Sequence, residues 1–169
     1  ATLEKLFIEN KEKRMIVAAF ASNVDRMQEV MNLAEKYKRK VVLTGRSMVK
    51  VTDVATQIGE MNVNKANFIE VEKMKNYKDS EILILSTGSQ GEPNSALSRM
   101  TAGEFKGIEI GDNDTIIFSS SPIPGNAQSV NQVVNKLARA GANVMVNSPL
   151  NSLHTSGHAS AEEQKLMLQ

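Results

Sequence analysis

The sequence predicts an α/β fold, a three-layer sandwich in which helices cover both faces of a mainly parallel, Rossmann-like sheet. Three observations lead to this prediction. Five short apolar runs recur along the chain, helix-like patterns lie between them, and the residues within a run are apolar at consecutive positions, as in Ile82-Leu83-Ile84-Leu85. Consecutive apolar residues are typical of strands buried on both faces, which is the environment of a parallel sheet between helices.

The apolar runs are the expected strands, and the segments between them are the expected helices. The runs span Met15 to Phe20, Val41 to Thr44, Ile82 to Ser86, Thr115 to Ser119 and Val144 to Asn147. Apolar residues recur at intervals of three and four from Val24 to Tyr37 and again from Met48 to Met61, which predicts two helices with one buried face each. A third helix from about Asn126 to Ala140 has the same spacing and stops at Gly141, a residue that commonly ends helices.

Two segments fit neither pattern. Residues 61–68 are too polar for the centre of a sheet, and residues 102–113 are rich in glycine and asparagine, which predicts a turn-rich excursion. The chain begins at Ala1 in an amphipathic helix pattern and stops at Gln169 inside another. We therefore expect a single domain over residues 1–169, without an interdomain linker, that is part of a longer protein.

Composition excludes several classes of protein. The chain has 169 residues, 41% of them hydrophobic and 23% charged, which suits one compact domain and not a disordered or fibrous protein. A net charge of +1 argues against the broad positive field of a free-standing DNA-binding module. The chain has no cysteine, so it forms no disulfide or thiolate site. No apolar run is long enough to cross a membrane, and we expect a cytoplasmic protein without a membrane partner.

The candidate functional residues follow the predicted strands. In parallel sheets, ligands collect at the carboxyl ends of the strands, where loops and helix amino termini meet. All five predicted strands are followed by polar residues there. In chain order these are Ser22 and Asn23, Arg46 and Ser47, the loop from Ser86 to Pro93, Ser119 to Ser121, and the segment from His154 to Ser160.

The loop from Ser86 to Pro93 leaves a strand, carries two glycines and enters a helix that is expected to begin near Pro93. This layout can present backbone amides to an anion, but it lacks the complete glycine-rich fingerprints of nucleotide-binding loops, and a simple turn is the favoured interpretation on composition alone. Arg99, about two helical turns later, either reaches back to a phosphate or is solvated, with solvation the default. Arg46 begins a helix, where the helix dipole does not favour a cation, so a ligand or carboxylate partner is expected.

The serines and asparagine near helix starts have a structural explanation. Side chains of Ser22, Asn23 and Ser47 can cap the helices that follow them, and capping is the favoured interpretation. The triplet from Ser119 to Ser121 precedes two prolines and lacks the surroundings of a serine nucleophile, so it predicts a rigid loop.

Both histidines of the chain, His154 and His158, lie together with Ser156 and Gly157 just after the fifth predicted strand. Two imidazoles, a hydroxyl and accessible amides suit a phosphate. A self-contained metal centre is not expected, because the chain has no third histidine and no cysteine. Spacing alone leaves two alternatives open, an exposed polar loop and a phosphate or general-acid site.

Several motifs occur in an order that resembles one known family, the β-CASP domain of ribonuclease J. The resemblance covers nearly the whole chain. The motifs that carry it are Val17 to Asn23, Gly45 to Met48, Ser86 to Pro93, Ala96 to Met100, Ser119 to Asn126 and His154 to Ala159.

The resemblance implies a role in a larger enzyme. In that family the β-CASP domain is inserted into a metallo-β-lactamase domain, and RNA enters a channel between the two. The combined enzyme is a metal-dependent ribonuclease with 5′-to-3′ exonuclease and endonuclease activity in bacterial RNA processing and decay. The family's metal-ligand motif is missing from this chain. The resemblance thus implies no cofactor here, zinc, manganese or magnesium in the full enzyme, RNA as a partner, and a homo-oligomeric full enzyme.

The resemblance also assigns residues. His158 corresponds to the histidine of the family's Ser-Gly-His motif, which lies beside the scissile phosphate and donates a proton or stabilises charge. By the same resemblance, His154, Ser156 and Gly157 belong to the surrounding phosphate-binding loop. By this resemblance, the residues expected to face RNA are Gly88, Ser89, Gly91, Glu92, Ser22 and Asn23. Arg46 and Arg99 are added as candidate phosphate-binding residues because of their own positions in the sequence. The chain alone is expected to be inactive.

Two other hypotheses remain open. The first is a non-catalytic α/β module that holds a nucleotide, sulfate or phosphate at the carboxyl edge of the sheet. The second is an assembly part whose exposed faces dock against another domain or subunit.

Overall fold

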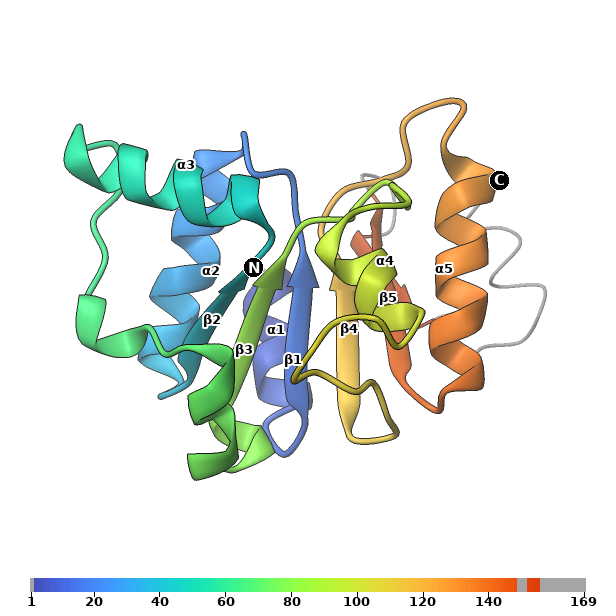
Figure 1. Ribbon diagram of the computed structural model, residues 1–169, viewed down its shortest axis with the longest axis horizontal. Coiled ribbons are helices and arrows are strands. Elements are labelled where there is room, and N and C mark those ends of the chain that lie inside the picture. Colours follow the sequence, from blue (N-terminus) through green and yellow to red (C-terminus); the bar gives the residue numbers. More distant parts are fainter. Residues whose placement is uncertain (1, 149–151, 156–169) are drawn as a thin grey trace.

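The computed structural model describes residues 2–148 and 152–155, and their strands form one six-stranded sheet (Figure 1). Its order is β2-β3-β1-β4-β5-β6. The first five strands in this order are parallel, and β6 pairs antiparallel with β5. The strands are β1 (Arg14–Ala18), β2 (Lys40–Thr44), β3 (Ile82–Ser86), β4 (Asp114–Phe118), β5 (Asn143–Ser148) and β6 (Ser152–Thr155). The prediction of an α/β fold with a mainly parallel sheet is confirmed.

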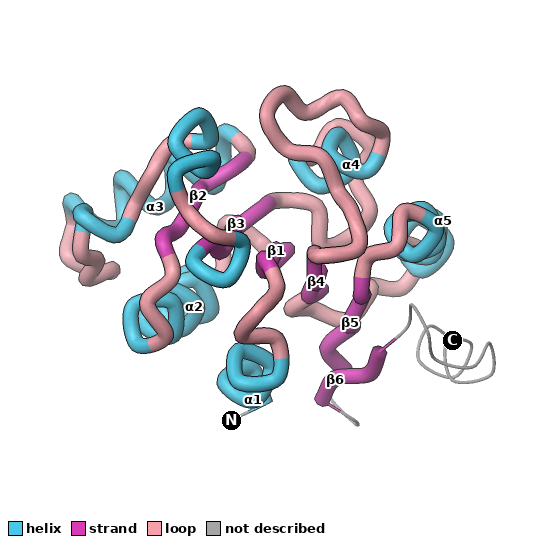
Figure 2. The backbone as a smooth tube through the Cα atoms, turned by 90° about the horizontal axis from the view of Figure 1, so that it is seen from below, coloured by secondary structure: helices cyan, strands magenta, loops and turns pink. Residues whose placement is uncertain are grey.

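Helices cover both faces of the sheet (Figure 2). Helices α1 (Thr2–Glu9) and α2 (Val24–Lys36) lie on one face, and α4 (Ala96–Thr101) and α5 (Ala127–Arg139) on the other. Helix α3 (Arg46–Gln57) contributes to the core on the α1 and α2 side. Three short 3₁₀ turns, η1 (Lys65–Asn67), η2 (Val71–Asn76) and η3 (Asp79–Glu81), complete the described structure. None of the helices in the described part is long and apolar enough to cross a membrane.

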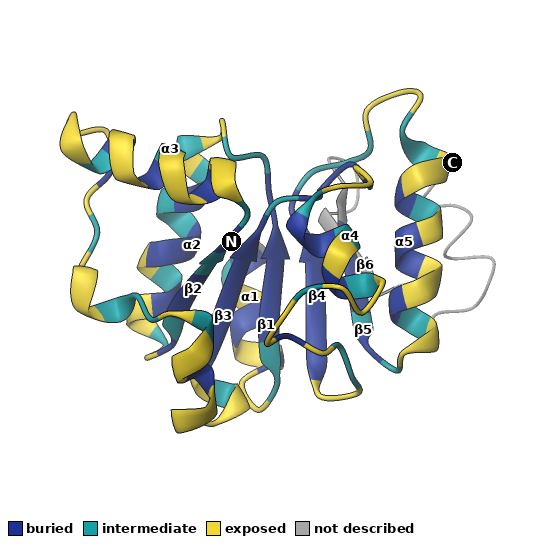
Figure 3. Cartoon of the chain, in the orientation of Figure 1, coloured by how far each residue is buried: buried dark blue, intermediate teal, exposed yellow. Residues whose placement is uncertain are grey.

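The two cores explain why the strands are apolar at consecutive positions. Ile16 of β1 and Ile84 of β3 belong to the core under α4 and α5, while Val17 and Leu85 belong to the core under α1 and α2. All four side chains are fully buried. Figure 3 shows β1, β3 and β4 buried along most of their length. A strand whose alternate side chains enter two different cores has no polar face, and this is why its sequence lacks the alternation of a half-exposed strand.

Two details of the structure differ from the expectations, and two agree with them. The helix expected near Pro93 begins at Ala96, with Ser95 as its cap, because the Ser95 hydroxyl accepts the amide of Ser98 at 3.2 Å. Strand β6 was not predicted, because no apolar run marks it. The segment over residues 61–68 gives only one parallel bridge, between Val41 and Phe68. Residues 102–113 contain no helix or strand, as their composition predicts.

The expectation that Ser47 caps α3 is wrong. Gly45 occupies the cap position and has a φ of 95°, so Ser47 lies inside the helix. A Cβ atom added at Gly45 would lie 2.6 Å from the Thr87 hydroxyl oxygen. Gly45 is therefore needed for two reasons, a left-handed backbone and the close approach of the loops that follow β2 and β3.

A buried arginine, Arg39, joins segments of the chain at the amino-terminal ends of the strands. Arg39 is only 2% exposed, and its guanidinium donates hydrogen bonds to the carbonyl oxygens of Asn10 at 2.9 Å, Lys13 at 2.8 Å and Ile82 at 2.8 Å. Burial lowers the pKa of Arg39 to about 10, which leaves it charged at neutral pH. One cation thus joins the chain after α1 to the starts of β1 and β3.

A second arginine joins β1 to β4 at the same edge. The Arg14 guanidinium binds both carboxylate oxygens of Asp114, at 2.6 and 3.0 Å, and also donates to the carbonyl oxygen of Glu109 at 3.0 Å. The Asp114 carboxylate in turn accepts the amide of Gly111 at 2.9 Å. Both side chains of the pair are largely buried, so the orientations of the guanidinium and of the carboxylate are both restricted.

Replacing Arg39 with methionine should lower the free energy of unfolding by about 3–5 kcal/mol, because several buried carbonyl oxygens lose a charged donor at once. The matched control is Arg139→Met on the exposed end of α5, which should change stability by no more than about 0.5 kcal/mol. Urea unfolding of both variants checks the difference. Equal midpoints for the two variants would show that the buried network does not hold this edge.

Candidate functional site

The carboxyl ends of four parallel strands meet in one row. Ser86 pairs with both Ala18 and Thr44, and Ala18 pairs with Phe118, so β1 to β4 all end at the same level. The loops that follow them emerge together at this edge of the sheet (Figure 1). The prediction that polar segments after these strands line one edge is confirmed for the four loops that begin at residues 19, 45, 87 and 119.

The loop after β3 is turned inward and is not an open cradle. Gly88, Ser89, Gln90 and Gly91 are all buried. The amide of Gln90 donates to the Glu92 carboxylate at 2.9 Å, and the amide of Gly91 donates to the carbonyl oxygen of Gly88 at 3.1 Å. Two of the amides that an anion would need are therefore used within the loop.

Gln90 links this loop to the loop after β4. Its side-chain amide nitrogen donates to the carbonyl oxygen of Ser121 at 3.2 Å, and its side-chain oxygen accepts the amide of Ile123 at 2.7 Å and the side-chain nitrogen of Asn126 at 3.3 Å. Gln90 is 4% exposed, so these bonds form away from solvent. The sequence did not single out Gln90, because nothing in the local pattern shows that its partners lie about thirty residues further along the chain.

Gly91 packs directly against the backbone of α5. Its φ is 73°, and an added Cβ atom would lie 2.6 Å from the carbonyl carbon of Ser129. Ser89, next to it in the loop, is 1% exposed, and its hydroxyl has no hydrogen-bond partner among the residues that the structure describes. Gly91 and Ser89, both expected to face RNA, thus lie in the packed layer beneath the surface of the edge.

Other predicted residues are exposed at or near the edge. Asn23 accepts the amide of Arg26 at 3.0 Å, which confirms it as the cap of α2, and Ser22 beside it is exposed. Arg46 is exposed and makes no ion pair with any residue in the described ranges. Glu92 is exposed, although its carboxylate holds the amide of Gln90.

Arg99 lies on α4 with its guanidinium 5.1 Å from the centre of the Phe105 ring. It is exposed, as expected for a solvated helix arginine, but it rests on an aromatic face. A guanidinium over an aromatic ring is attracted to the ring face by a cation–π interaction.

The histidine segment is only partly described. His154 lies in β6, where it pairs with Val146, so its backbone belongs to a strand and not to a loop. Because β6 is antiparallel to β5, the chain runs from the carboxyl edge back along the sheet by the time it reaches Thr155, which pairs with Met145. His158, Ser156 and Gly157 lie outside the described residues.

Residues 2–148 and 152–155 bring together no group of three histidine, cysteine, aspartate or glutamate side chains that could hold a metal ion. The donor set at the carboxyl edge consists of hydroxyls, amides, one carboxylate and arginine, which suits an anionic or nucleic-acid ligand better than a cation.

Comparison with known proteins agrees with these features. A family model described as "Ribonuclease J, beta-CASP domain" matches residues 12–137. Ribonuclease J 1 of Streptococcus pyogenes serotype M3 is 45% identical over 161 residues, which cover 95% of this chain and 29% of the relative. Ribonuclease J of Mycoplasma pneumoniae is 42% identical over 172 residues, covering 98% of this chain and 30% of the relative.

Ribonuclease J of Thermus thermophilus is 46% identical over 155 residues, which cover 92% of this chain and 27% of that protein. The chain therefore spans less than a third of the length of these relatives. The family model extends from just before β1 to the last turns of α5, so it includes all four loops of the carboxyl edge. The chain belongs to the ribonuclease J β-CASP domain family.

Proposed function

We propose that this chain serves as the β-CASP domain of a ribonuclease J and forms one wall of its RNA channel. The family match over residues 12–137 is the observation that carries the proposal. The wall is the carboxyl edge of the sheet, where exposed Ser22 and Asn23 follow β1, exposed Arg46 follows β2, and Gln90 joins the loops that follow β3 and β4. A guanidinium without an ion pair in the described part suits the RNA backbone, because arginine binds phosphate with two parallel hydrogen bonds.

The proposal divides the work between two domains. Residues 1–169 form a single β-CASP domain, and a metallo-β-lactamase domain elsewhere in the parent protein holds zinc, manganese or magnesium. The parent is a bacterial cytoplasmic enzyme of RNA processing and decay, with 5′-to-3′ exonuclease and endonuclease activity and a homo-oligomeric assembly. The described residues contain no group of three histidine, cysteine, aspartate or glutamate side chains that could hold a metal ion.

Within this division, residues of this chain bind and orient the RNA and protonate the leaving oxygen. His158 donates a proton to the leaving oxygen of the scissile phosphodiester or stabilises its charge, and His154, Ser156 and Gly157 hold the phosphate beside it. Arg99, over the ring of Phe105, offers a guanidinium that can stack on a base or bind the backbone. Buried Gln90 holds the loops after β3 and β4 together, and Gly91 packs this part of the edge against α5.

The 169-residue chain should not cleave a 5′-monophosphorylated RNA when manganese, magnesium or zinc is added, because the metal ligands belong to the other domain. Product formation is followed on denaturing gels, with the full-length parent enzyme as the positive control. Robust metal-dependent cleavage by the 169-residue chain would contradict the division of work between the domains.

In the full-length parent enzyme, His158→Ala should reduce kcat by about 10²–10⁴-fold, since a positioned proton donor contributes roughly that factor. The comparison variant is His154→Ala, which removes the other histidine of the segment and should raise KM more than it lowers kcat. Thermal unfolding of both variants verifies that the fold is intact. A His158→Ala enzyme with unchanged kcat would remove this residue from the chemical step.

Gln90→Ala should lower the free energy of unfolding by about 2 kcal/mol, because the amide of Ile123 and the carbonyl of Ser121 lose their buried partner. It should also weaken RNA binding by the parent enzyme, since the two loops it joins lose their spacing. Gln132→Ala, on the exposed side of α5, is the matched control and should change neither quantity. Unfolding in urea and RNA titration check the two effects separately.

A further inference from the structure

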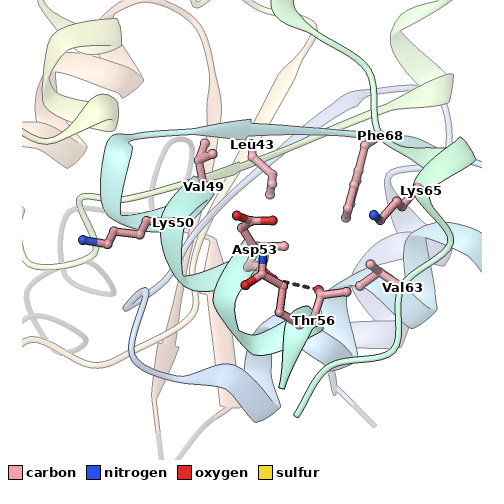
Figure 4. Close-up of a pocket in the computed structure, with 10 residues that line it drawn as sticks. Leu43, Val49, Lys50, Asp53, Thr56, Val63, Lys65 and Phe68 are labelled. Carbon is pink, nitrogen blue, oxygen red and sulfur yellow. Dashed lines mark hydrogen bonds between the residues drawn. The ribbon is translucent and has the colours of Figure 1, made fainter. Parts of the chain in front are cut away.

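A second candidate site lies beside β2, the outermost strand on one side of the sheet. A solvent-open cavity of about 620 Å³ lies beside β2 and is bordered by α3 and the segment over residues 63–68 (Figure 4). Small-molecule sites usually have volumes of about 300–1,000 Å³, so the cavity is large enough for a ligand of moderate size. Its lining includes no residue of the four loops at the carboxyl edge, so the cavity is separate from the proposed RNA wall.

The cavity is preformed, because its outer wall is fastened at both ends. At one end, Asn62 and Gln28 exchange two hydrogen bonds, from the Asn62 amide at 2.8 Å and to the Asn62 carbonyl oxygen at 2.9 Å. At the other end, the amide of Ile69 donates to the carbonyl oxygen of Val41 at 3.0 Å. The wall between these points is held away from α3, and the space remains open.

The walls combine apolar and charged groups. Leu43 and Phe68 are half-buried and face one another across the cavity, with Val63 beneath them (Figure 4). The Asp53 carboxylate lies on the α3 side, and the Lys65 ammonium points inward from the opposite side. Neither charge has an ion-pair partner within the described part of the chain.

We propose that this cavity binds a nucleoside 5′-monophosphate. The base stacks on the Phe68 ring, an aromatic surface that accepts any base. The Asp53 carboxylate accepts hydrogen bonds from the N–H groups of the base, and the Lys65 ammonium binds the phosphate. A ligand of this class supplies a planar ring, hydrogen-bond donors and an anion together, and the cavity presents a partner for each.

The arrangement also predicts which base is preferred. Guanine presents two adjacent N–H donors on its Watson–Crick edge, and a carboxylate has two acceptor oxygens that can receive both. Adenine presents only one donor group on that edge, beside an acceptor that the carboxylate repels. GMP should therefore bind more tightly than AMP. This inference goes beyond the proposed function, because no step of RNA cleavage depends on it.

The test is a titration of the purified full chain with GMP, AMP and guanosine, followed by backbone amide shifts. GMP should give saturable shifts at residues 43, 53, 63 and 68, with weaker binding of AMP and of guanosine. Phe68→Leu should weaken GMP binding by about tenfold, the loss expected when a stacking partner is removed. Asp53→Asn, at an exposed position that does not affect folding, should abolish the preference for GMP over AMP.

Two lysines that line the cavity provide a matched pair. The Lys65 ammonium points inward, whereas that of Lys50 points away from the cavity (Figure 4). Lys65→Ala should make GMP and guanosine bind equally, and Lys50→Ala should leave GMP affinity unchanged. Equal losses in the two variants would overturn the proposal, because they would reflect a general charge effect.

Two further outcomes would also overturn it. One is the absence of saturable shifts with GMP. The other is binding of a short 5′-phosphorylated oligoribonucleotide without binding of GMP, which would make the cavity part of an RNA path. RNA cleavage by the full-length parent should be unchanged in the Lys65→Ala variant, so failure of this proposal is distinguishable from failure of the proposed nuclease function.

Discussion

In-register parallel pairing brings the last residues of four strands, Ala18, Thr44, Ser86 and Phe118, into one row. This alignment determines where the loops can go. Since parallel strands all point the same way, each must be followed by a connection that starts at this row and returns outside the sheet. The loops with Asn23, Gly45, Gln90 and Ser121 are therefore neighbours although they are far apart in sequence.

The two edges of the sheet differ in chemistry as a result. At the amino-terminal edge, Arg39 and Arg14 use their charges on carbonyl oxygens and on Asp114, so these cations are satisfied inside the protein. At the carboxyl edge, Arg46 is exposed and without an ion pair in the described ranges, while buried Gln90 holds neighbouring loops in place. The first edge stabilises the fold, and the second leaves polar groups for a ligand.

The sequence predicted the parts of the fold that depend on local pattern. Strands such as Ile82–Ser86 and helices such as Val24–Lys36 follow from apolar spacing, because each element needs to bury one or two faces. Long-range contacts were not predictable in this way. The partners of the Gln90 and Arg39 side chains lie between 26 and 43 residues away along the chain, and the role of Gly45 depends on Thr87. Composition favoured a simple turn for the loop after β3, and only the family resemblance assigned it to face RNA. In the structure, packing against α5 turns this loop inward.

The single bridge between Val41 and Phe68 has a consequence for solubility. Strand β2 ends the sheet, and an uncovered end strand is a template on which other chains can add and form aggregates. The bridge uses the outward carbonyl of Val41, and the Lys40 ammonium beside it donates to the carbonyl oxygen of Ala66 at 3.1 Å. The segment that crosses beside β2 and the Lys40 side chain occupy positions that an added strand would need, so they hinder strand addition on this side of the sheet.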